Sequence, residues 1–272
     1  MADFYKLFLV GRTGNGKSST GNSIIPGKPF PLTSNTMIKH SGVLNGINVE
    51  VVDGTGIGDV AEDLNGDMKT LVLDVESMFY NKLSQSFTAL VLVLRFGARF
   101  TNPLKESMRI IKSMFGEDIF RKCGIILMTC GDNYNKEENV SFDVWIHNQS
   151  GDIKTLMEEC DYRCVLFNNK TRNNSKVRKQ VDKLMSAVAQ VKYTPYTARD
   201  FDNAKRGRQR LKYSKPTQND GDYGYSTNTT DKQMLIPTVA RCSKRKTLII
   251  ALIVVVGLII LITVLAVKLS EK

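Results

Sequence analysis

The feature that most constrains the fold is a stretch of eight residues near the beginning of the chain, GRTGNGKS at residues 11–18. It fits the pattern G-x-x-x-x-G-K-[ST] and follows the apolar run FYKLFLV, and its last residue, Ser18, begins SSTGNSII, which is compatible with a helix. A glycine-rich turn between a strand and a helix lets backbone N–H groups converge on phosphate oxygens. The stretch therefore predicts a phosphate-binding loop, with a chance match to the pattern as the alternative.

The positions of this loop have separate expected roles. Lys17 supplies a cation for the β- and γ-phosphates, and the hydroxyl of Ser18 can ligate Mg²⁺. The candidate nucleotide-binding residues here are Gly11, Arg12, Thr13, Gly14, Asn15, Gly16, Lys17, Ser18 and Ser19.

A second candidate phosphate and metal motif, DGTG at residues 53–56, follows an apolar run. In the D-x-x-G form the carboxylate, here Asp53, reaches Mg²⁺ through water, and the N–H of the last glycine, Gly56, meets a γ-phosphate. Between the two motifs, LTSNTMIK offers Thr36 as a switch threonine that senses Mg²⁺, with Thr33 and Ser34 as alternatives. A turn glycine after a strand is the alternative for DGTG. The metal-ligating candidates are Ser18, Thr36 and Asp53.

Apolar runs and helix-type periodicity alternate along the first two thirds of the chain. Asn45-Gly46 suits a two-residue hairpin turn. Further strands are expected at residues 87–94, 124–129 and 163–167, and helices around 107–115 and 175–191. This alternation predicts an α/β fold in three layers, a mainly parallel sheet with one antiparallel strand contributed by the hairpin.

Asp132 lies just beyond the apolar run that ends at Thr129, and both are candidate nucleotide contacts. A carboxylate there can accept hydrogen bonds from guanine N1–H and the exocyclic amine, whereas adenine offers a lone pair in place of N1–H. Asp132 therefore favours GTP over ATP. A solvated loop aspartate is the alternative.

The C-terminal part of the chain differs from the rest in composition. Residues 247–267 hold no charge over 21 residues, enough to span a bilayer, and basic residues 244–246 precede them. We expect a tail anchor, with a buried core helix as the alternative. The expected organisation is a nucleotide-binding domain at 1–194, a flexible linker at 195–246, the transmembrane helix at 247–267 and a short tail at 268–272.

The N-terminus, the cysteines and the net charge indicate in which compartment the folded part lies and which partners it binds. The N-terminus lacks the pattern of a secretory signal, so we expect the folded part to face the cytosol and the five cysteines to be reduced thiols without a structural zinc. The formal net charge is +11, but no aromatic-interleaved recognition motif accompanies it, and no nucleic-acid partner is expected. The basic piece NAKRGRQRLKYSK could lie on anionic lipid head groups or serve as a solvated tether.

Taken together, residues 4–191 resemble the GIMAP group of immunity-associated nucleotide-binding (AIG1-type) GTPases, relatives of chloroplast-import receptor GTPases and of septins. The resemblance rests on GRTGNGKSSTGNSI, on residues 53–56, on ALVLVLRFGARFTNPLKESMRIIKSMFGEDIFRKCGIILMTCGD and on RCVLFNNKT. It implies that Asp132 with Asn168 or Asn169 holds the guanine. It also implies self-association of the GTP-bound state beside the nucleotide, a membrane anchor and a role in immune or stress regulation.

Two departures from the usual GTPase pattern bear on catalysis. Cys130 stands where a lysine usually packs beneath the base, and Ile57 stands where efficient small GTPases place a water-orienting glutamine. Slow hydrolysis by a monomer follows. The resemblance implies an arginine supplied across a dimer, and Arg99 is the candidate, with an ordinary exposed loop arginine as the alternative; the catalytic candidates are Arg99 and Thr36. A GTP-binding scaffold with negligible turnover and an ATP-dependent P-loop kinase are the competing functions.

Overall fold

The computed structural model describes residues 4–27, 29–31, 38–54, 68–98, 101–137 and 140–213. Contacts divide the chain into two units, residues 1–216 and 217–272, and the second lies outside the described residues. Within the described ranges, no helix is both long and apolar enough to cross a membrane. The tail anchor expected at 247–267 falls outside these ranges and stays a prediction.

A six-stranded sheet forms the centre of the described domain, with the strand order β2-β3-β1-β5-β6-β7. Only the β2–β3 pair is antiparallel, and the other neighbours run parallel, with registers such as Leu7 opposite Val51 and Leu9 opposite Val91. The strands are β1 (Phe4–Val10), β2 (Ile38–Leu44), β3 (Ile47–Asp53), β5 (Ala89–Arg95), β6 (Gly124–Thr129) and β7 (Cys164–Leu166). The predicted mainly parallel sheet with one antiparallel strand is confirmed.

The hairpin and the central strands form for the reasons that the sequence indicated. Asn45 and Gly46 both have positive φ, 50° and 82°, as a two-residue turn between twisted strands requires. Strands β5 and β6 are buried along almost their whole length, because helices cover both faces of the sheet.

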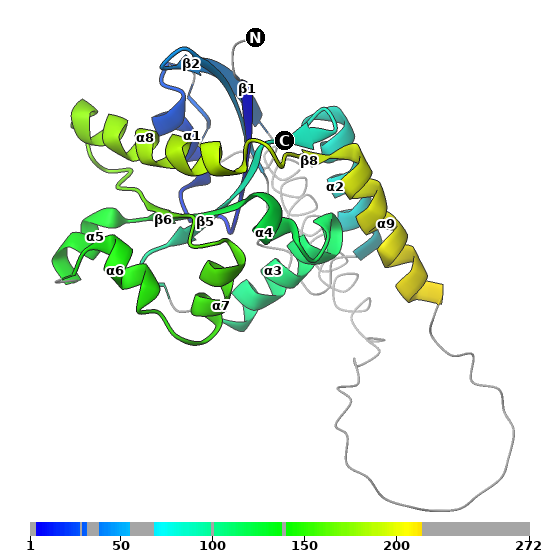
Figure 1. Ribbon diagram of the computed structural model, residues 1–272. Coiled ribbons are helices and arrows are strands. Elements are labelled where there is room, and N and C mark those ends of the chain that lie inside the picture. The colour runs from blue at the N-terminus through cyan, green and yellow to red at the C-terminus, as the bar shows by residue number, and fades with distance from the viewer. Residues whose placement is uncertain are drawn as a thin grey trace, which may run out of the picture. The chain divides into compact units, whose positions relative to one another are not determined.

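Helices on the two faces of the sheet complete the three layers (Figure 1). On one face lie α1 (Lys17–Ile24) and α8 (Asn174–Val191), and on the other α2 (Met68–Asn81) and α3 (Asn102–Phe115). Shorter helices connect the later strands: α4 (Ile119–Cys123), α5 (Gly131–Glu137), α6 (Phe142–His147) and α7 (Gly151–Glu159).

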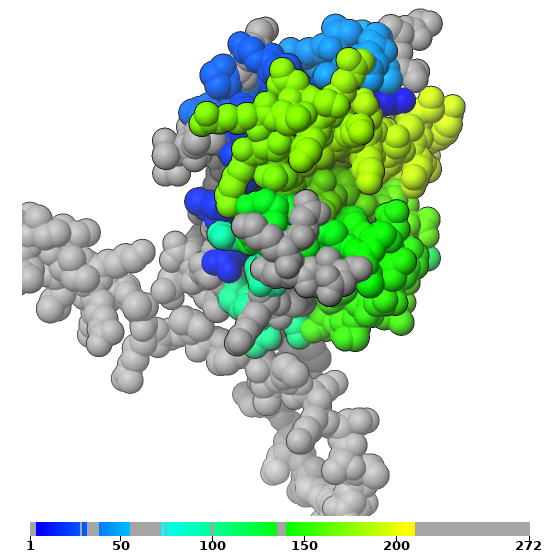
Figure 2. All heavy atoms as spheres, turned by 90° about the vertical axis from the view of Figure 1, so that its left-hand side faces the viewer, coloured from blue at the N-terminus to red at the C-terminus, as the bar shows by residue number. Residues whose placement is uncertain are grey.

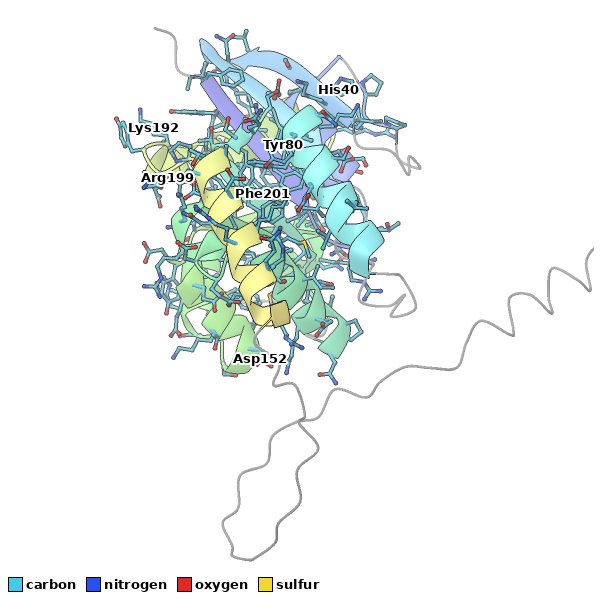
Figure 3. The ribbon with its side chains drawn as sticks, turned by 90° about the vertical axis from the view of Figure 1, so that its right-hand side faces the viewer. His40, Tyr80, Asp152, Lys192, Arg199 and Phe201 are labelled. Carbon is cyan, nitrogen blue, oxygen red and sulfur yellow. The ribbon has the colours of Figure 1, made fainter. Side chains whose placement is uncertain are left out.

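The structure corrects the beginning of the expected linker at 195–246. Strand β8 (Tyr196–Thr197) pairs with β4 (Ser86–Phe87), and α9 (Ala198–Tyr213) follows it directly and packs on α3. The ring of Phe201 stacks on Phe79 of α2 at 4.3 Å, and Figure 3 shows Phe201 between α9 and α2. A few aromatic contacts, rather than a continuous apolar stripe, hold this polar helix to the domain.

Part of the basic piece NAKRGRQRLKYSK is also engaged within the domain. Lys205 and Arg208 of α9 pair with the carboxylate of Glu76 on α2, at 3.0 and 3.6 Å. These two cations therefore stabilise the docking of α9. The remainder of the linker lies outside the described residues.

The described cysteines, Cys123, Cys130, Cys160 and Cys164, are free thiols. Over the same described ranges, no group of histidine, cysteine and acidic residues could hold a metal ion in the manner of a structural zinc site.

Candidate functional site

The candidate site lies where loops leave the carboxyl ends of the parallel strands. The glycine-rich loop follows β1, Asp53 ends β3, Asp132 follows β6, and the segment containing Asn168 and Asn169 follows β7. In open α/β sheets, ligands bind beyond this edge. The fold therefore brings the described predicted site residues, which are far apart in sequence, to one edge of the sheet.

The glycine-rich loop has the backbone of an anion site. Gly14 and Gly16 have φ values of 82° and 94°, which favour glycine, and Gly16 is the N-cap of α1. No side chain caps this helix, and its first turn holds no acidic residue. The first N–H groups of α1 and its positive dipole end are thus available to bind an anion.

Neighbouring strands hold the loop in place. The side-chain amide of Asn15 donates to the carbonyl of Val93 on β5 at 2.9 Å, and the Thr129 hydroxyl donates to the carbonyl of Asn15 at 2.8 Å. A Cβ at Gly11 would lie 2.4 Å from the same Val93 oxygen, so only glycine fits there. In this structure Asn15 and Thr129, both predicted nucleotide contacts, support the loop.

Lys17 is the most enclosed cation of the loop, with 8% of its surface exposed. Its ammonium donates to the carbonyls of Gly11 at 2.8 Å and Arg12 at 3.1 Å. These bonds hold a positive charge directly over the loop, where phosphate oxygens would lie in a loop of this type.

Asp53 and Ser18 form the candidate metal position. The Ser18 hydroxyl donates to Oδ2 of Asp53 at 2.5 Å, while the buried Oδ1 has no hydrogen-bond partner among the described residues. Burial raises the pKa of Asp53, and the Ser18 hydrogen bond and the charge of Lys17 oppose this shift. A carboxylate oxygen without a partner beside a hydroxyl suits Mg²⁺, which prefers oxygen ligands. The residues present therefore fit the ion that the sequence implied.

The base side of the site is built from the loops after β6 and β7. Asp132 lies in the first turn of α5, and its Oδ2 pairs with the ammonium of Lys170 at 3.0 Å. The amide of Asn169 donates to the Thr20 hydroxyl at 3.1 Å and its oxygen accepts from Ser23 at 3.3 Å, which ties this loop to α1. Asn168 accepts from the backbone N–H of Lys170 at 2.9 Å.

This arrangement includes residues that sequence reasoning missed. Lys170 directly follows the predicted pair Asn168 and Asn169, and its position in NNK was the available signal. No sequence pattern indicates that Asn15 anchors the loop, because its partner is a backbone carbonyl on a strand 78 residues away.

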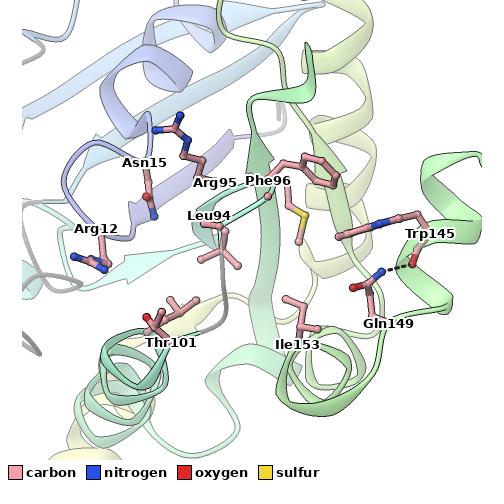
Figure 4. A pocket seen from close by; sticks show the side chains of 13 residues that line it. Arg12, Asn15, Leu94, Arg95, Phe96, Thr101, Trp145, Gln149 and Ile153 are labelled. Atoms are coloured by element: carbon pink, nitrogen blue, oxygen red, sulfur yellow. Dashed lines mark hydrogen bonds between the residues drawn. The ribbon is translucent and has the colours of Figure 1, made fainter. Parts of the chain in front are cut away.

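A cavity of about 330 Å³ adjoins the loop on the side of α3 and α6 (Figure 4). Arg12, Asn15 and Arg95 contribute polar groups to its lining, and Phe96 and Trp145 contribute aromatic surface. Because Arg12 and Asn15 belong to the glycine-rich loop, the cavity lies directly beside the candidate phosphate site.

Several predicted positions lie outside the described residues. These are the switch candidates Thr36, Thr33 and Ser34, the motif residues Gly56 and Ile57, and the proposed catalytic Arg99. Their roles stay predictions.

Comparison with solved structures supports the fold. Toc33 from Arabidopsis thaliana in complex with GDP and Mg²⁺ superposes with a TM-score of 0.51 at 16% identity, covering 70% of this chain and 86% of that chain. The same protein with Mg²⁺ and GMPPNP gives a TM-score of 0.51. At this identity the similarity shows a shared P-loop GTPase-like fold.

Sequence comparison shows to which family the chain belongs. Immune-associated nucleotide-binding protein 5 from Arabidopsis thaliana is 32% identical over 184 residues, 67% of this chain and 59% of that protein. Protein 3 of the same series is 28% identical over 193 residues, 68% of this chain. The chain spans 56% of protein 3 and 59% of protein 5, less than two thirds of either relative. The AIG1 family model matches residues 5–214, from β1 to the end of α9. With its glycine-rich loop, Asp53 and Asp132 at the edge of a P-loop GTPase-like sheet, the chain belongs to the AIG1 family.

Proposed function

We propose that this domain binds GTP together with Mg²⁺ and hydrolyses GTP slowly. The observation that carries the proposal is the Ser18–Asp53 pair at the N-terminus of α1, 2.5 Å apart, with one Asp53 oxygen left for a further partner. The structures of Toc33 with GDP, GMPPNP and Mg²⁺ support the choice of ligands.

Different residues of the site would bind the phosphates, hold Mg²⁺ and keep the loop in position. The N–H groups at the start of α1 accept the phosphate charge, and the Lys17 ammonium lies where it can pair with phosphate oxygens. Ser18 and Asp53 would hold Mg²⁺, which when bound neutralises charge that develops on the phosphates. Asn15 and Thr129 keep the loop in a fixed geometry, which lowers the entropic cost of binding.

Asp132 would select guanine by accepting from N1–H and the exocyclic amine, in exchange for its pairing with Lys170. An Asp132→Asn variant tests this role. Xanthine carries a carbonyl where guanine has the amine, so an asparagine amide can donate to it. We expect the variant to lose GTP affinity and gain affinity for xanthosine triphosphate. Equal loss for both nucleotides would count against base recognition by Asp132.

The proposed hydrolysis is weak in the monomer and stimulated by dimerisation through the nucleotide-side surface. Hydrolysis by the monomer is weak because Ile57 cannot orient the attacking water. Dimerisation would stimulate it because Arg99 would act across the dimer, an effect worth roughly 10³–10⁵ in rate. Turnover per molecule should rise with protein concentration and lose this dependence in Arg99→Ala. A second candidate function, a GTP-binding scaffold with negligible turnover, predicts a flat low rate for both proteins.

We further propose that the chain is anchored by residues 247–267 in an intracellular membrane with the nucleotide-binding domain in the cytosol, serving immune or stress regulation. The uncharged stretch of 21 residues and the names of the immune-associated relatives support this proposal. Protease treatment of intact organelles should degrade the domain and leave only a small C-terminal fragment. Full protection of the domain would contradict the proposed orientation.

A further inference from the structure

Helix α8 carries a row of cations on its outer face. The α8 basic stripe consists of Arg172, just before the helix, and Lys176, Lys179 and Lys183 within it, and all four are exposed. Spacings of three and four residues place the three lysines within about 60° of arc around the helix. Val181, Leu184 and Val188 are buried on the face that packs on the domain. Figure 2 shows α8, in yellow-green, at the surface of the molecule.

No acidic residue of the described domain forms an ion pair with the α8 basic stripe. Asp182 is the single acidic residue within α8, and its carboxylate accepts from the side-chain amide of Asn45 at 3.2 Å. Arg178 donates to the same asparagine at 3.0 Å, so these two side chains serve the β2–β3 turn. Over the described ranges, no ion pair joins a residue of the stripe to an acid.

The stripe acts against the stability of its own helix. Lys176 lies in the first turn, where the helix dipole disfavours cations, and that turn holds no acidic residue. Lys179 lies three residues after Lys176 and four before Lys183, spacings at which like charges repel. An ordinary solvated face would gain from interspersed acids. A row of four cations with the single acid Asp182 beside it is instead stabilised when an anionic surface neutralises it.

The surroundings of the stripe favour a bilayer as that surface. Tyr193, just beyond the end of α8, is 84% exposed, and the Lys192 ammonium lies 5.0 Å from its ring centroid. An exposed amphipathic ring beside a cation suits the head-group region of a membrane. The basic piece NAKRGRQRLKYSK was a candidate for lipid contact or for a solvated tether, and two of its cations in α9, Lys205 and Arg208, are paired with Glu76.

We propose that the α8 basic stripe binds the anionic head groups of a bilayer and so fixes the orientation of the nucleotide-binding domain on the membrane. This contact goes beyond anchoring by residues 247–267 and does not depend on nucleotide. Each lysine near an anionic surface contributes about fivefold in affinity, so the three lysines together shift the equilibrium about 100-fold toward the docked state.

Lysine labelling of the full chain tests the proposal without truncation. The protein is reconstituted in vesicles of phosphatidylcholine alone or with added phosphatidylserine, treated with a membrane-impermeant acetylating reagent, and analysed by mass spectrometry. We expect labelling of Lys176, Lys179 and Lys183 to slow at least about tenfold on the anionic vesicles at low salt, and to recover at high salt. Lys82, exposed directly after the end of α2 and outside the stripe, is the internal control and should label equally on both vesicles.

A variant separates direct contact from general charge effects. Lys179→Gln should reduce the protection of Lys176 and Lys183 about fivefold, whereas Lys82→Gln should leave it unchanged. Equal labelling of the stripe on both kinds of vesicle would overturn the proposal. Protection of the stripe by added RNA on neutral vesicles, in the absence of protection by anionic lipid, would assign it to nucleic acid instead.

Discussion

Replacing Phe201 by alanine should destabilise the whole described domain, although the residue lies in a segment whose composition suggests a linker. Phe201 is fully buried, and its ring stacks on Phe79 at 4.3 Å and lies 5.9 Å from Phe115. Truncating a buried phenylalanine to alanine costs about 3–5 kcal/mol. Because small domains are stable by only about 5–15 kcal/mol, this loss is a large fraction of the total.

Urea unfolding of the full chain in mild detergent measures the loss. Trp145 is the only tryptophan in the chain and lies in α6, so its fluorescence reports the domain rather than the docking of α9 alone. Tyr193→Ala is the matched control, since this ring is 84% exposed and its removal should cost less than about 0.5 kcal/mol. A Phe201→Ala midpoint equal to that of the control would show that α9 is not part of the cooperative unit.

Three further predictions concern the site and the thiols. Burial raises the pKa of Asp53, so above that pKa the ionised carboxylate lowers stability in the nucleotide-free protein. Asp53→Asn should therefore raise Tm at pH 7, with a gain that shrinks as pH falls toward 3.8 and reverses in sign when Mg²⁺ and GTP are present. A lower Tm for the nucleotide-free Asp53→Asn protein at pH 7 would show that the Asp53 carboxylate stabilises the fold, contrary to this prediction. Gly11→Ala forces a Cβ to 2.4 Å from the Val93 oxygen and should cost about 1–3 kcal/mol in chemical unfolding; an unchanged midpoint would mean that the loop relaxes freely. Burial raises the pKa of Cys123 and of Cys160 to about 12, so iodoacetamide at pH 8 should modify neither until the protein unfolds, which peptide mass spectrometry can check.

The sequence was sufficient to predict the sheet and the glycine-rich loop between β1 and α1. The strands are continuous apolar runs, the turn at Asn45-Gly46 needs two residues that tolerate positive φ, and the loop is a dense local pattern. Each of these signals lies within a few neighbouring residues. Local patterning therefore predicts them.

The features that the sequence missed depend on partners far along the chain. α9 is strongly polar, and it docks because Phe201 meets rings from α2 and α3 and because Glu76 pairs with two of its cations. The Asp132–Lys170 pair joins loops 38 residues apart. Asn169 was one of two candidates for the base contact, with Asn168 as the other, and its side chain is bonded to α1 through Thr20 and Ser23. Such pairings exist only once the sheet has brought the loops together.

Equilibrium titration of the full chain with GTP and with ATP, in Mg²⁺ and in EDTA, measures whether the protein binds GTP selectively and together with Mg²⁺. We expect GTP to bind in Mg²⁺, ATP to bind at least about 100-fold more weakly, and Ser18→Ala to remove most of the effect of Mg²⁺. Equal affinity for the two nucleotides, or GTP binding that is indifferent to both EDTA and Ser18→Ala, would contradict the account of Asp132, Ser18 and Asp53 given by this structure.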